Sequence, residues 1–564
     1  MPARLVMKTE EAPRRGAELL LEVLRSEGVE YIFGNPGTTE LPLMDALTGV
    51  TDIAYVLALQ EASAVAMADG YAQASGKVGF LNLHTAGGLG HGMGNLLNAA
   101  VSQTPLVVTA GQQDSRHSIT DPLLFADLVS VARPAMKWAQ EVANPAQLPV
   151  LVRRAFNDAN AAPSGPVFLS LPMNVLEDLT TVDAGEPSFV ERHAVAGSLI
   201  ALADRLTAIT PGKLAIIAGD EIHGSMAAGE TVALAEALAA SVFGSSWPAH
   251  IPFPTAHPLW CGNLTTRATE IAAKLEGFEA VLALGGKSLI TILYTEGSAL
   301  PPHCELYQIS SDVRDLGRTY HTGLSAVGDI RASLQALLPL VLERTTPRAA
   351  EYAVLVEWAA KTSQQRTAEN ELEIRELLDR SPILPQVAAH EAVRAIGPKV
   401  AIVDESIATA NDVRRFLRSW SPTQYSFLRG GALGWGMPAA VGASLGLGRS
   451  PVVCLVGDGA AMYSPQAMWT AAHEKLPVTF VVMNNGEYNV LKKFMRSQPQ
   501  FLSAQTGRFI AMDITQPPVD YQALAASMGL SAQRVLSARE IAPVMEAAIA
   551  SGRPNLVEIV IAAL

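Results

Sequence analysis

The chain has 564 residues, of which 49% are hydrophobic and 17% are charged. This length is too great for one hydrophobic core and predicts three or four domains, and the composition is that of a compact globular enzyme. Because 41 basic and 54 acidic residues give a net charge of −13, nucleic acid is excluded as the expected partner.

The amino-terminal segment and the cysteines predict a cytoplasmic protein. The segment MPARLVMKTEEAPRRG lacks the apolar stretch of a signal peptide, and no run of about 18 apolar residues predicts a membrane span. Cys261, Cys304 and Cys454 do not have the spacing of metal ligands, which favours reduced residues in the core. We therefore expect no association with a membrane.

The first predicted domain, residues 1–190, alternates strands with alanine-rich helical segments. Its expected strands are Tyr31–Phe33, Ile53–Leu57, Val78–Leu83, Leu106–Ala110 and Val167–Leu171. Alternation of this kind is typical of an α/β domain with a doubly wound parallel sheet.

Three polar residues stand near the expected strand ends of this domain. Glu61 opens the helical run EASAVAMADGYAQAS, where the helix dipole alone favours a carboxylate. Thr38 follows Pro36-Gly37, which is typical of a type II turn, and is suited to cap the next helix. His84 precedes the glycine-rich stretch TAGGLGHGMGN, which we expect to be a loop that approaches a ligand closely. A purely structural role also explains each of these residues.

The second predicted domain, residues 195–342, repeats the alternation, and residues 343–379 form a charged helical linker. The expected strands are Leu214–Ala218, Ala280–Leu284 and Leu306–Ile309. Gly219 and the pair Gly285-Gly286 follow two of them, but no complete G-x-G-x-x-G fingerprint is present. Tight turns therefore explain these glycines better than nucleotide binding does.

The third predicted domain, residues 380–564, ends on the strand Asn555–Ile561 and contains two apolar, β-branched runs. Val452–Val456 and Val478–Met483 are expected to be buried parallel strands. Between them, Ser464–Leu476 has helical spacing, with Ser464 as the N-cap and Pro465 at the first helical position.

A right-handed crossover places the carboxyl ends of these two strands side by side. Asp458 follows the first strand and Asn485 follows the second. Ligands of open α/β sheets bind at this edge, and carboxylate and amide oxygens are ligands that suit Mg²⁺. The sequence therefore predicts a site for a metal-bound diphosphate.

The pattern Gly457-Asp458-Gly459 followed by Asn484-Asn485 resembles the GDG…NN signature of thiamine-diphosphate enzymes. The order of the blocks along the chain is most similar to the benzoylformate decarboxylase family. The resemblance implies pyrimidine-binding, central and diphosphate-binding domains. It also implies a lyase that cleaves C–C bonds, decarboxylating an aromatic or branched 2-oxo acid, with carboligation as a second activity.

The resemblance further implies that thiamine diphosphate and Mg²⁺ bind to this chain. Asp458, Asn485 and the carbonyl of Glu487 match the metal ligands of the family. The other positions that match its cofactor-binding residues are Glu61, Gly431, Leu433, Gly457, Gly459, Ala460, Tyr488, Asn489 and Val490. Leu433 matches an aliphatic wedge between the two cofactor rings, although packing in the core explains this residue as well.

Three residues of the first domain acquire catalytic roles from the resemblance. Glu61 matches the carboxylate that bonds to the aminopyrimidine ring, Thr38 a serine that contacts the substrate carboxylate, and His84 an acid–base histidine. The implied substrate pocket consists of Thr38, His84, Ile292, Ile407, Leu491 and Phe494. Ile292 and Ile407 replace a histidine and a threonine of the family, which leaves decarboxylation, carboligation and other C–C cleavage open.

Two other functions stay open from the sequence. One is a transferase similar to acetolactate synthase, with or without a flavin in the central domain. The other is a non-catalytic nucleotide-binding paralogue. The resemblance also implies a homodimer or homotetramer in which the first domain of one chain and the third domain of another form each active site.

Overall fold

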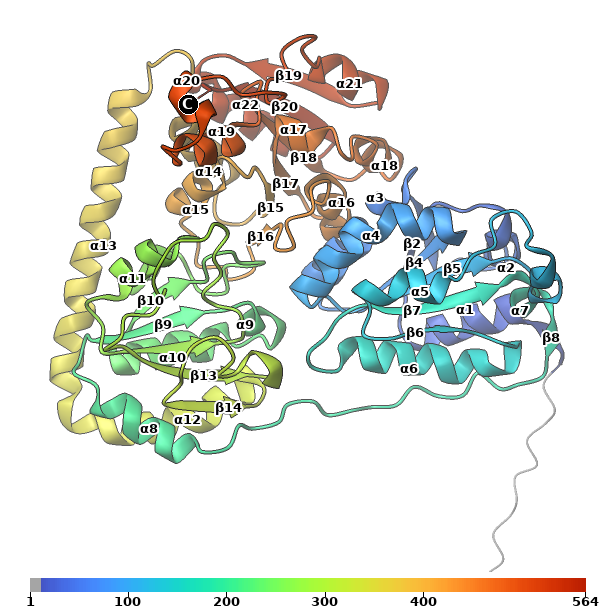
Figure 1. The fold of residues 1–564 in the computed structure, drawn as a ribbon, viewed down its shortest axis with the longest axis horizontal. Helices are drawn as coiled ribbons and strands as arrows, with labels where there is room; N and C mark the ends of the chain where they lie inside the picture. The colour runs from blue at the N-terminus through green and yellow to red at the C-terminus, as the bar shows by residue number, and fades with distance from the viewer. Residues whose placement is uncertain (1–11, 564) are drawn as a thin grey trace, which may run out of the picture. The chain divides into compact units, whose positions relative to one another are not determined.

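The computed structural model describes residues 12–563, which form three six-stranded parallel sheets and one two-stranded antiparallel ribbon (Figure 1). The chain folds as two compact units. The first comprises the residues up to Val190 together with Gly430–Gly448, and the second comprises Glu191–Arg429 with the residues from Arg449 onward. Helices flank each six-stranded sheet, which confirms the predicted α/β class of three doubly wound parallel sheets. Most of the amino-terminal segment MPARLVMKTEEAPRRG, which is predicted not to be a signal peptide, lies outside the described residues.

The sheet of the first unit has the strand order β3-β2-β4-β5-β7-β6, and all neighbouring strands are parallel. Its strands are β2 (Tyr31–Gly34), β3 (Ala54–Leu57), β4 (Gly79–His84), β5 (Leu106–Gln112), β6 (Ala139–Glu141) and β7 (Val167–Pro172). The five predicted strands are present, with ends that differ by one or two residues. The sequence AQE of the edge strand β6 lacks the β-branched residues that marked the others. The antiparallel ribbon pairs β1 (Arg14–Arg15) with β8 (Leu179–Thr180).

Helices of the first unit pack in two groups. Their bounds are α1 (Gly16–Ser26), α2 (Leu41–Leu47), α3 (Glu61–Ser75), α4 (Thr85–Ser102), α5 (Leu128–Ala132), α6 (Leu148–Asn160), α7 (Met173–Glu177) and α16 (Gly436–Gly446). Helix α1 packs against α6 and α7, whereas α3 packs against α4 and α16. The start of α3 at Glu61 and its end before Gly76 confirm the predicted helix.

Helices α3 and α16 approach each other closely because glycine stands at their contact. A Cβ atom on Gly442 would lie 1.9 Å from the carbonyl oxygen of Met67, so only a residue without a side chain fits there. Just before α16, the indole nitrogen of Trp435 donates a hydrogen bond of 2.8 Å to the buried carboxylate of Asp69. Residues far apart in the sequence are thereby joined in one unit.

The glycine-rich stretch after His84 is not a loop but the first half of helix α4, so that prediction is wrong. A Cβ atom on Gly88 would lie 3.0 Å from Cγ of Glu61, and one on Gly92 would lie 3.1 Å from Cγ2 of Val65. The glycines therefore allow α4 to lie against α3. This packing offsets the low intrinsic helix propensity of glycine.

The second unit contains the central sheet, of order β11-β10-β9-β12-β13-β14, and the third sheet, of order β16-β15-β17-β18-β20-β19. The central strands are β9 (Leu214–Ala218), β10 (Ser241–Gly244), β11 (Trp260–Asn263), β12 (Ala280–Leu284), β13 (Glu305–Ser310) and β14 (Leu324–Val327). The third sheet consists of β15 (Ala401–Glu405), β16 (Tyr425–Phe427), β17 (Val452–Gly457), β18 (Val478–Asn484), β19 (Ser531–Val535) and β20 (Asn555–Val560). The strands predicted in both sheets are confirmed.

The helices of the second unit begin with α8 (Leu199–Ala208), α9 (Glu221–Gly224), α10 (Ala228–Leu238), α11 (Ala268–Leu275) and α12 (Ile330–Thr345). The remainder are α13 (Ala349–Leu377), α14 (Pro385–Ile396), α15 (Ala410–Phe416), α17 (Asp458–Ala461), α18 (Ala467–His473), α19 (Asn489–Arg496), α20 (Leu502–Thr506), α21 (Tyr521–Ser527) and α22 (Ala538–Ala550). Helix α18 starts later than predicted and Ser464 is not its N-cap, because the carbonyls of Ser464 and Pro465 accept the N–H groups of Ala467 and Met468 in tight turns. No helix in the described part of the chain is long and apolar enough to cross a membrane.

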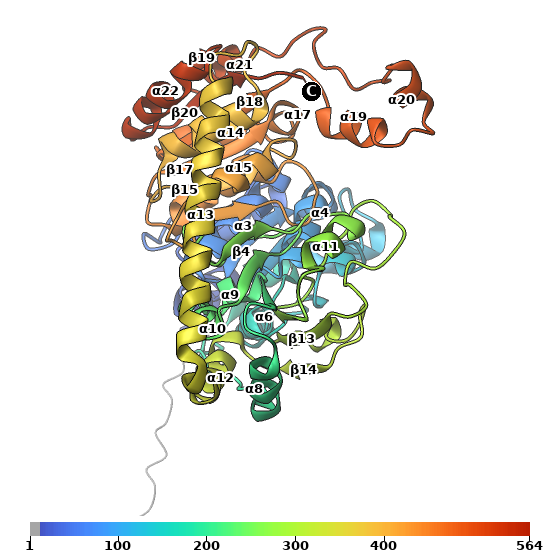
Figure 2. The same cartoon turned by 90° about the vertical axis from the view of Figure 1, so that its left-hand side faces the viewer.

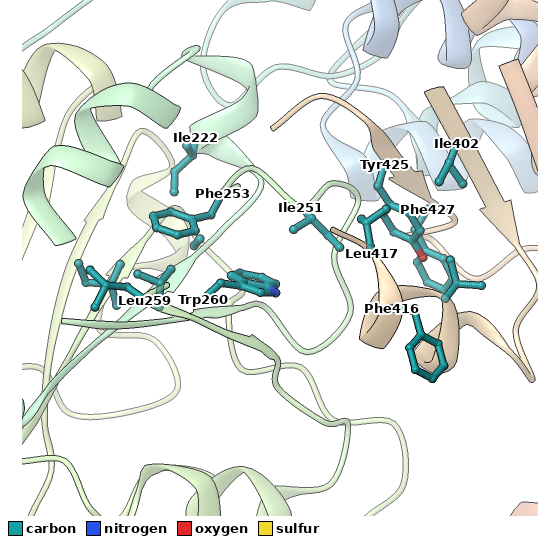
Figure 3. Close-up of a cluster of buried hydrophobic side chains, with 14 of the residues drawn as sticks. Ile222, Ile251, Phe253, Leu259, Trp260, Ile402, Phe416, Leu417, Tyr425 and Phe427 are labelled. Atoms are coloured by element: carbon teal, nitrogen blue, oxygen red, sulfur yellow. The ribbon is translucent and has the colours of Figure 1, made fainter. Parts of the chain in front are cut away.

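The predicted charged linker is largely the long helix α13, which runs beside both sheets of the second unit (Figures 1 and 2). The two sheets share one cluster of buried side chains, shown in Figure 3. In this cluster, Phe253 and Trp260 belong to the central domain, whereas Phe416, Tyr425 and Phe427 belong to the third domain. Burial of this aromatic surface holds the two sheets together.

We predict that Gly442→Ala lowers the free energy of unfolding by at least about 2 kcal/mol, because the added Cβ atom meets a backbone carbonyl that cannot move aside. Gly229→Ala in α10 is the matched control, since nothing lies within 4 Å of its added Cβ atom. Helix propensity predicts that the control stabilises the protein by up to about 1 kcal/mol. Urea denaturation of both variants measures the difference, and equal midpoints would contradict the packing argument.

Candidate active site

The carboxyl ends of β17 and β18 lie side by side, as the sequence predicts, and they bring Asp458 to the segment that contains Asn485. One carboxylate oxygen of Asp458 accepts the N–H of Gly459 at 2.8 Å, and the other accepts the N–H of Gly486 at 2.7 Å. The side-chain oxygen of Asn485 accepts the N–H of Glu487 at 3.1 Å. Backbone groups therefore fix both oxygen donors at this edge of the sheet.

The donor set at this edge fits a divalent cation. Asp458 is 4% exposed, and burial raises the pKa of its carboxyl group. Among residues 12–563 no cationic side chain pairs with this carboxylate, so a bound cation would offset the cost of burying its charge. The side chain of Glu487 is already engaged by Lys492 and Asn489, and its backbone carbonyl accepts the N–H of Asn489 at 2.9 Å, which leaves one lone pair of that carbonyl for a metal.

The segments after β17 and β18 place their backbones next to each other. Gly457 precedes α17, to which Gly459 and Ala460 belong, and a Cβ atom on Gly459 would lie 2.6 Å from the ring of Tyr488. Helix α19 then begins with Asn489 and Val490. Two helix starts at the edge of a sheet are suited to the binding of an anion, such as a diphosphate.

Glu61 is the first residue of α3, and the side chain of Gln60 caps this helix by accepting the N–H of Ser63 at 3.0 Å. The Glu61 carboxylate, 8% exposed as a residue, accepts from Nδ2 of Asn35 at 3.3 Å and lies 3.1 Å from Nδ1 of His91. The sequence alone points to neither His91 nor Asn35 as a partner of Glu61. In a helix, residues three positions apart lie on the same face, so His91 faces α3 as Gly88 does. This spacing carries no information if the stretch is expected to be a loop.

His84 ends β4, and its ring is held by the buried carboxylate of Glu40. Nδ1 of His84 lies 2.8 Å from Oε2 of Glu40, which is 1% exposed. The hydroxyl of Thr39 donates to the same carboxylate at 2.7 Å and lies 3.1 Å from the imidazole nitrogen. The hydrogen bond to Glu40 is the main cause that raises the pKa of His84. With Nδ1 donating to a carboxylate, Nε2 is the nitrogen left for proton transfer.

The turn before this site differs from the prediction. Gly37 has φ −127°, which excludes a type II turn, and Thr38 opens a short 3₁₀ turn rather than capping α2. Glycine is needed there because a Cβ atom on Gly37 would lie 2.4 Å from the ring of His84. Thr38 is exposed, whereas Thr39 and Glu40 are buried and make the contacts to the histidine.

The loop that contains Gly431 and Leu433 belongs to the first unit, together with Glu61. The side-chain amide of Asn98 in α4 holds this loop through two hydrogen bonds to Ala432. Its oxygen accepts the N–H of Ala432 at 3.0 Å, and its nitrogen donates to the carbonyl of Ala432 at 2.8 Å. Gly431 has φ +82°, a conformation that favours glycine. Leu433 is half-buried beside it.

The four predicted apolar pocket residues all lie in the second unit but differ in burial. Ile407 packs against the buried cluster, and Phe494 is half-buried in α19. Ile292 and Leu491 are each 45% exposed.

In the central sheet, the carboxylate of Glu221 occupies the strand edge where a nucleotide would approach. It accepts the N–H of Gly286 at 2.8 Å and both the N–H and the hydroxyl of Ser311 at 2.7 Å. Gly285 and Gly286 thus form turns that are bound by the protein's own carboxylate. This arrangement supports the interpretation of these glycines as turn residues.

Three family models match the chain along its length. They describe the N-terminal TPP binding domain of thiamine pyrophosphate enzymes over residues 14–129, the central domain over 202–337, and the C-terminal TPP binding domain over 406–559. The chain belongs to the thiamine pyrophosphate enzyme family. It is therefore an enzyme that depends on thiamine pyrophosphate, also called thiamine diphosphate.

Relatives within this family differ in their reactions. The chain is 31% identical to benzoylformate decarboxylase of Pseudomonas aeruginosa, covering 95% of this chain and 97% of that protein. It is 25% identical to the mitochondrial catalytic subunit of acetolactate synthase of Aspergillus candidus, covering 97% of this chain and 80% of the other. The structure of thiamine diphosphate-dependent 4-hydroxybenzoylformate decarboxylase of Rhodococcus jostii RHA1 matches with a TM-score of 0.84 and 28% identity, covering 97% and 99%.

We predict that Glu40→Gln lowers the pKa of His84, because the raised value comes chiefly from the Glu40 carboxylate. A raised histidine pKa stabilises the fold fully below pH 6.5, the ordinary value, and this stabilisation is lost as the pH rises through the folded-state value. The variant should therefore lose stability at pH 6 but little at pH 9, as measured by thermal unfolding across pH. Glu30→Gln, at a surface pair with Lys77, is the control. A loss that is the same at every pH would contradict the pairing.

We further predict that Asp458→Asn removes the stabilisation of the protein by Mg²⁺ with thiamine diphosphate, because an amide offers the cation no negative charge. Because burial raises the carboxyl pKa above 3.8, the free energy of unfolding falls as the pH rises from that value through the raised one. A bound cation would restore about 2.7 kcal/mol at a hundredfold excess over its Kd. Thermal unfolding with and without both ligands measures this effect.

The control is Asp412→Asn, another carboxyl of the second unit whose pKa is raised by burial. It should retain the full response to the ligands. A retained response in Asp458→Asn would remove Asp458 from the metal site.

Proposed function

We propose that this enzyme is a lyase that decarboxylates an aromatic or branched 2-oxo acid, with transfer of the product fragment to a second carbonyl compound as a further reaction. The observation that carries this proposal is the His84–Glu40 pair in the same unit as Glu61. It provides a histidine with a defined tautomer and a raised pKa, which is suited to general acid–base catalysis.

Glu61, Gly431 and Leu433 are the residues that we assign to the pyrimidine end of the cofactor. Bound thiamine diphosphate supplies a carbon nucleophile and an electron sink for C–C cleavage. Glu61 would hold a proton between its carboxylate and the pyrimidine ring, since its position at a helix start and its contacts with Asn35 and His91 keep it oriented.

Asp458, Asn485 and the carbonyl of Glu487 are the ligands that we assign to Mg²⁺. The two backbone bonds to Asp458 support this role, because a carboxylate that is held in place loses little conformational freedom on binding a metal. The remaining residues assigned to the diphosphate end are Gly457, Gly459, Ala460, Tyr488, Asn489 and Val490.

For the substrate we assign the carboxylate to the hydroxyl of Thr38 and proton transfer to Nε2 of His84. The exposure of Thr38 and its place beside Thr39, which contacts His84, support this assignment. We assign an apolar pocket to Ile292, Ile407, Leu491 and Phe494, which would favour a branched or aromatic side chain.

We propose that the enzyme is cytoplasmic and works as a homodimer or homotetramer, with each active site formed by the first domain of one chain and the third domain of another. The domain bounds in this proposal are residues 1–190, 195–342 and 380–564, with 343–379 as the linker. The stretch Gly430–Gly448 of the last range belongs to the first unit, together with Glu61. Membership of the family supports this assembly.

The second candidate is a transferase that condenses two 2-oxo acids, as an acetolactate synthase does. Ile292, in place of the family's second histidine, favours it because a proton donor for aldehyde release is then missing. The Glu221 carboxylate argues against a flavin in the central domain, since it already binds the amides of Gly286 and Ser311. We expect the purified protein to show no flavin absorbance band.

Incubation with Mg²⁺, thiamine diphosphate and a panel of 2-oxo acids separates the candidates. Release of CO₂ and an aldehyde from an aromatic or branched acid is the expected result. Hydroxyketone or acetohydroxy acid formation without free aldehyde would replace the lyase with the transferase. No turnover of any acid would leave only the non-catalytic paralogue.

We predict that Glu61→Gln lowers turnover by at least about a hundredfold while the fold is unchanged, because the amide cannot share a proton with the ring as a carboxylate does. Turnover of the best 2-oxo acid, together with circular dichroism, measures this. Glu186→Gln, exposed in the same unit, is the control with the same change of charge. Unchanged turnover in Glu61→Gln would remove this residue from catalysis.

A further inference from the structure

A cavity of about 370 Å³ in the second unit is lined by an excess of cationic side chains. It lies between the edge strand β11 of the central sheet, the linker helix α13 and helix α15 of the third domain. Its basic residues are Lys274, Arg366, Arg414, Arg415 and Arg418, against the single carboxylate of Glu371. In a protein with a net charge of −13, such a concentration of positive charge requires an explanation.

Three of these cations are engaged by the protein itself. Arg415 pairs with Glu373 and Asn370 of α13. Arg366 and Lys274 donate to backbone carbonyls, at 2.7 Å and 3.0 Å. Carbonyl oxygens accept hydrogen bonds but do not neutralise a charge, so both side chains remain positive toward the cavity.

Arg414 is the buried cation of the cavity, at 6% exposure. Its Nη2 donates to Asn411 at 2.6 Å, and its guanidinium lies 4.7 Å from the ring centre of Phe427 and close to Tyr425. Nε and Nη1 are buried and make no well-formed hydrogen bond. The buried carboxylate of Asp404 interacts with Arg414 electrostatically but is itself engaged by Tyr425 and Ser406. Because both nitrogen atoms are shielded from solvent, an anion in the cavity would be attracted by the charge of Arg414 rather than accept hydrogen bonds from them.

Arg418 has no hydrogen-bond or ion-pair partner among residues 12–563. Its partial burial and the nearby charge of Arg366 lower the pKa of its guanidinium. Burial also lowers the pKa of Lys274. The shift of Arg418 agrees with its lack of a counter-charge, whereas Lys274 has the carboxylate of Glu270 nearby.

The cavity also has neutral groups that suit a ligand. Thr265, Trp260 and Phe416 form part of the wall. The volume is within the range of cavities that hold small molecules. None of the residues assigned above to the cofactor, metal or substrate lines this cavity.

We propose that this cavity binds a small metabolite with two or more negative charges, carried by phosphate or carboxylate groups. The anion would contact Arg418 and Lys274 at the rim, and the charge of Arg414 at the base would add to the attraction. Because α13 and α15 both line the cavity, the bound anion would also fasten the linker helix to the third domain and stabilise the second unit.

Thermal unfolding and calorimetric titration of the enzyme, saturated with thiamine diphosphate and Mg²⁺, test this proposal. The probes are 3-phosphoglycerate for phosphate esters, succinate for dicarboxylates and glycerol as the neutral control. We expect at least one of the two anions to raise the melting temperature and bind with measurable heat, while glycerol does neither. Binding by one anion alone identifies the charged group that the site prefers.

The double variant Lys274→Gln with Arg418→Gln should weaken anion binding by about tenfold or more, because two charge-assisted contacts are lost. Both side chains reach solvent although neighbouring groups partly surround them, so the fold should be retained. The matched control, Lys361→Gln with Arg380→Gln, removes the same charge from exposed positions that do not line the cavity. Absence of binding by either anion, or equal weakening in both double variants, would overturn the proposal.

Discussion

Close packing of helices through glycine is the constraint on which the first unit depends. Helix α3 carries Glu61 at its start, and Gly88 of α4 and Gly442 of α16 allow both neighbouring helices to lie against it. At Gly442 the neighbouring atom is the backbone carbonyl oxygen of Met67, which cannot yield as a side chain can, so this contact restrains α3 against α16. The carboxylate thus has a fixed position that does not depend on a loop.

The same packing connects the separate parts of the candidate site. The loop with Gly431 and Leu433 is bound by Asn98 of α4, while His84 directly precedes that helix. The site is therefore built on the ends of regular elements rather than on mobile segments. Helix and strand ends hold side chains that bind a cofactor or transfer a proton more precisely than loops do.

The strands and the motif at Asp458 could be predicted because short buried strands are rich in β-branched residues and because the crossover rule places their ends together. The pairing of His84 with Glu40 could not be predicted, since it joins the end of β4 to the 3₁₀ turn before α2, which only the folded sheet brings together. Local rules also failed at Gly37 and in α4, where glycine serves tertiary contact rather than a turn or a loop. In both cases the neighbouring chain decides the conformation.

Helix α16 has a consequence for the order in which the chain can fold. It belongs to the first unit, although more than two hundred residues of the second unit separate it from the rest of that unit in the sequence. During synthesis, residues up to Val190 emerge long before Gly436–Gly446. Until then, the face of α3 that α16 covers stays exposed. The unit that carries Glu61 is thus completed only when most of the chain has been made. A fragment that ends at Val190 would lack helix α16, which packs against α3.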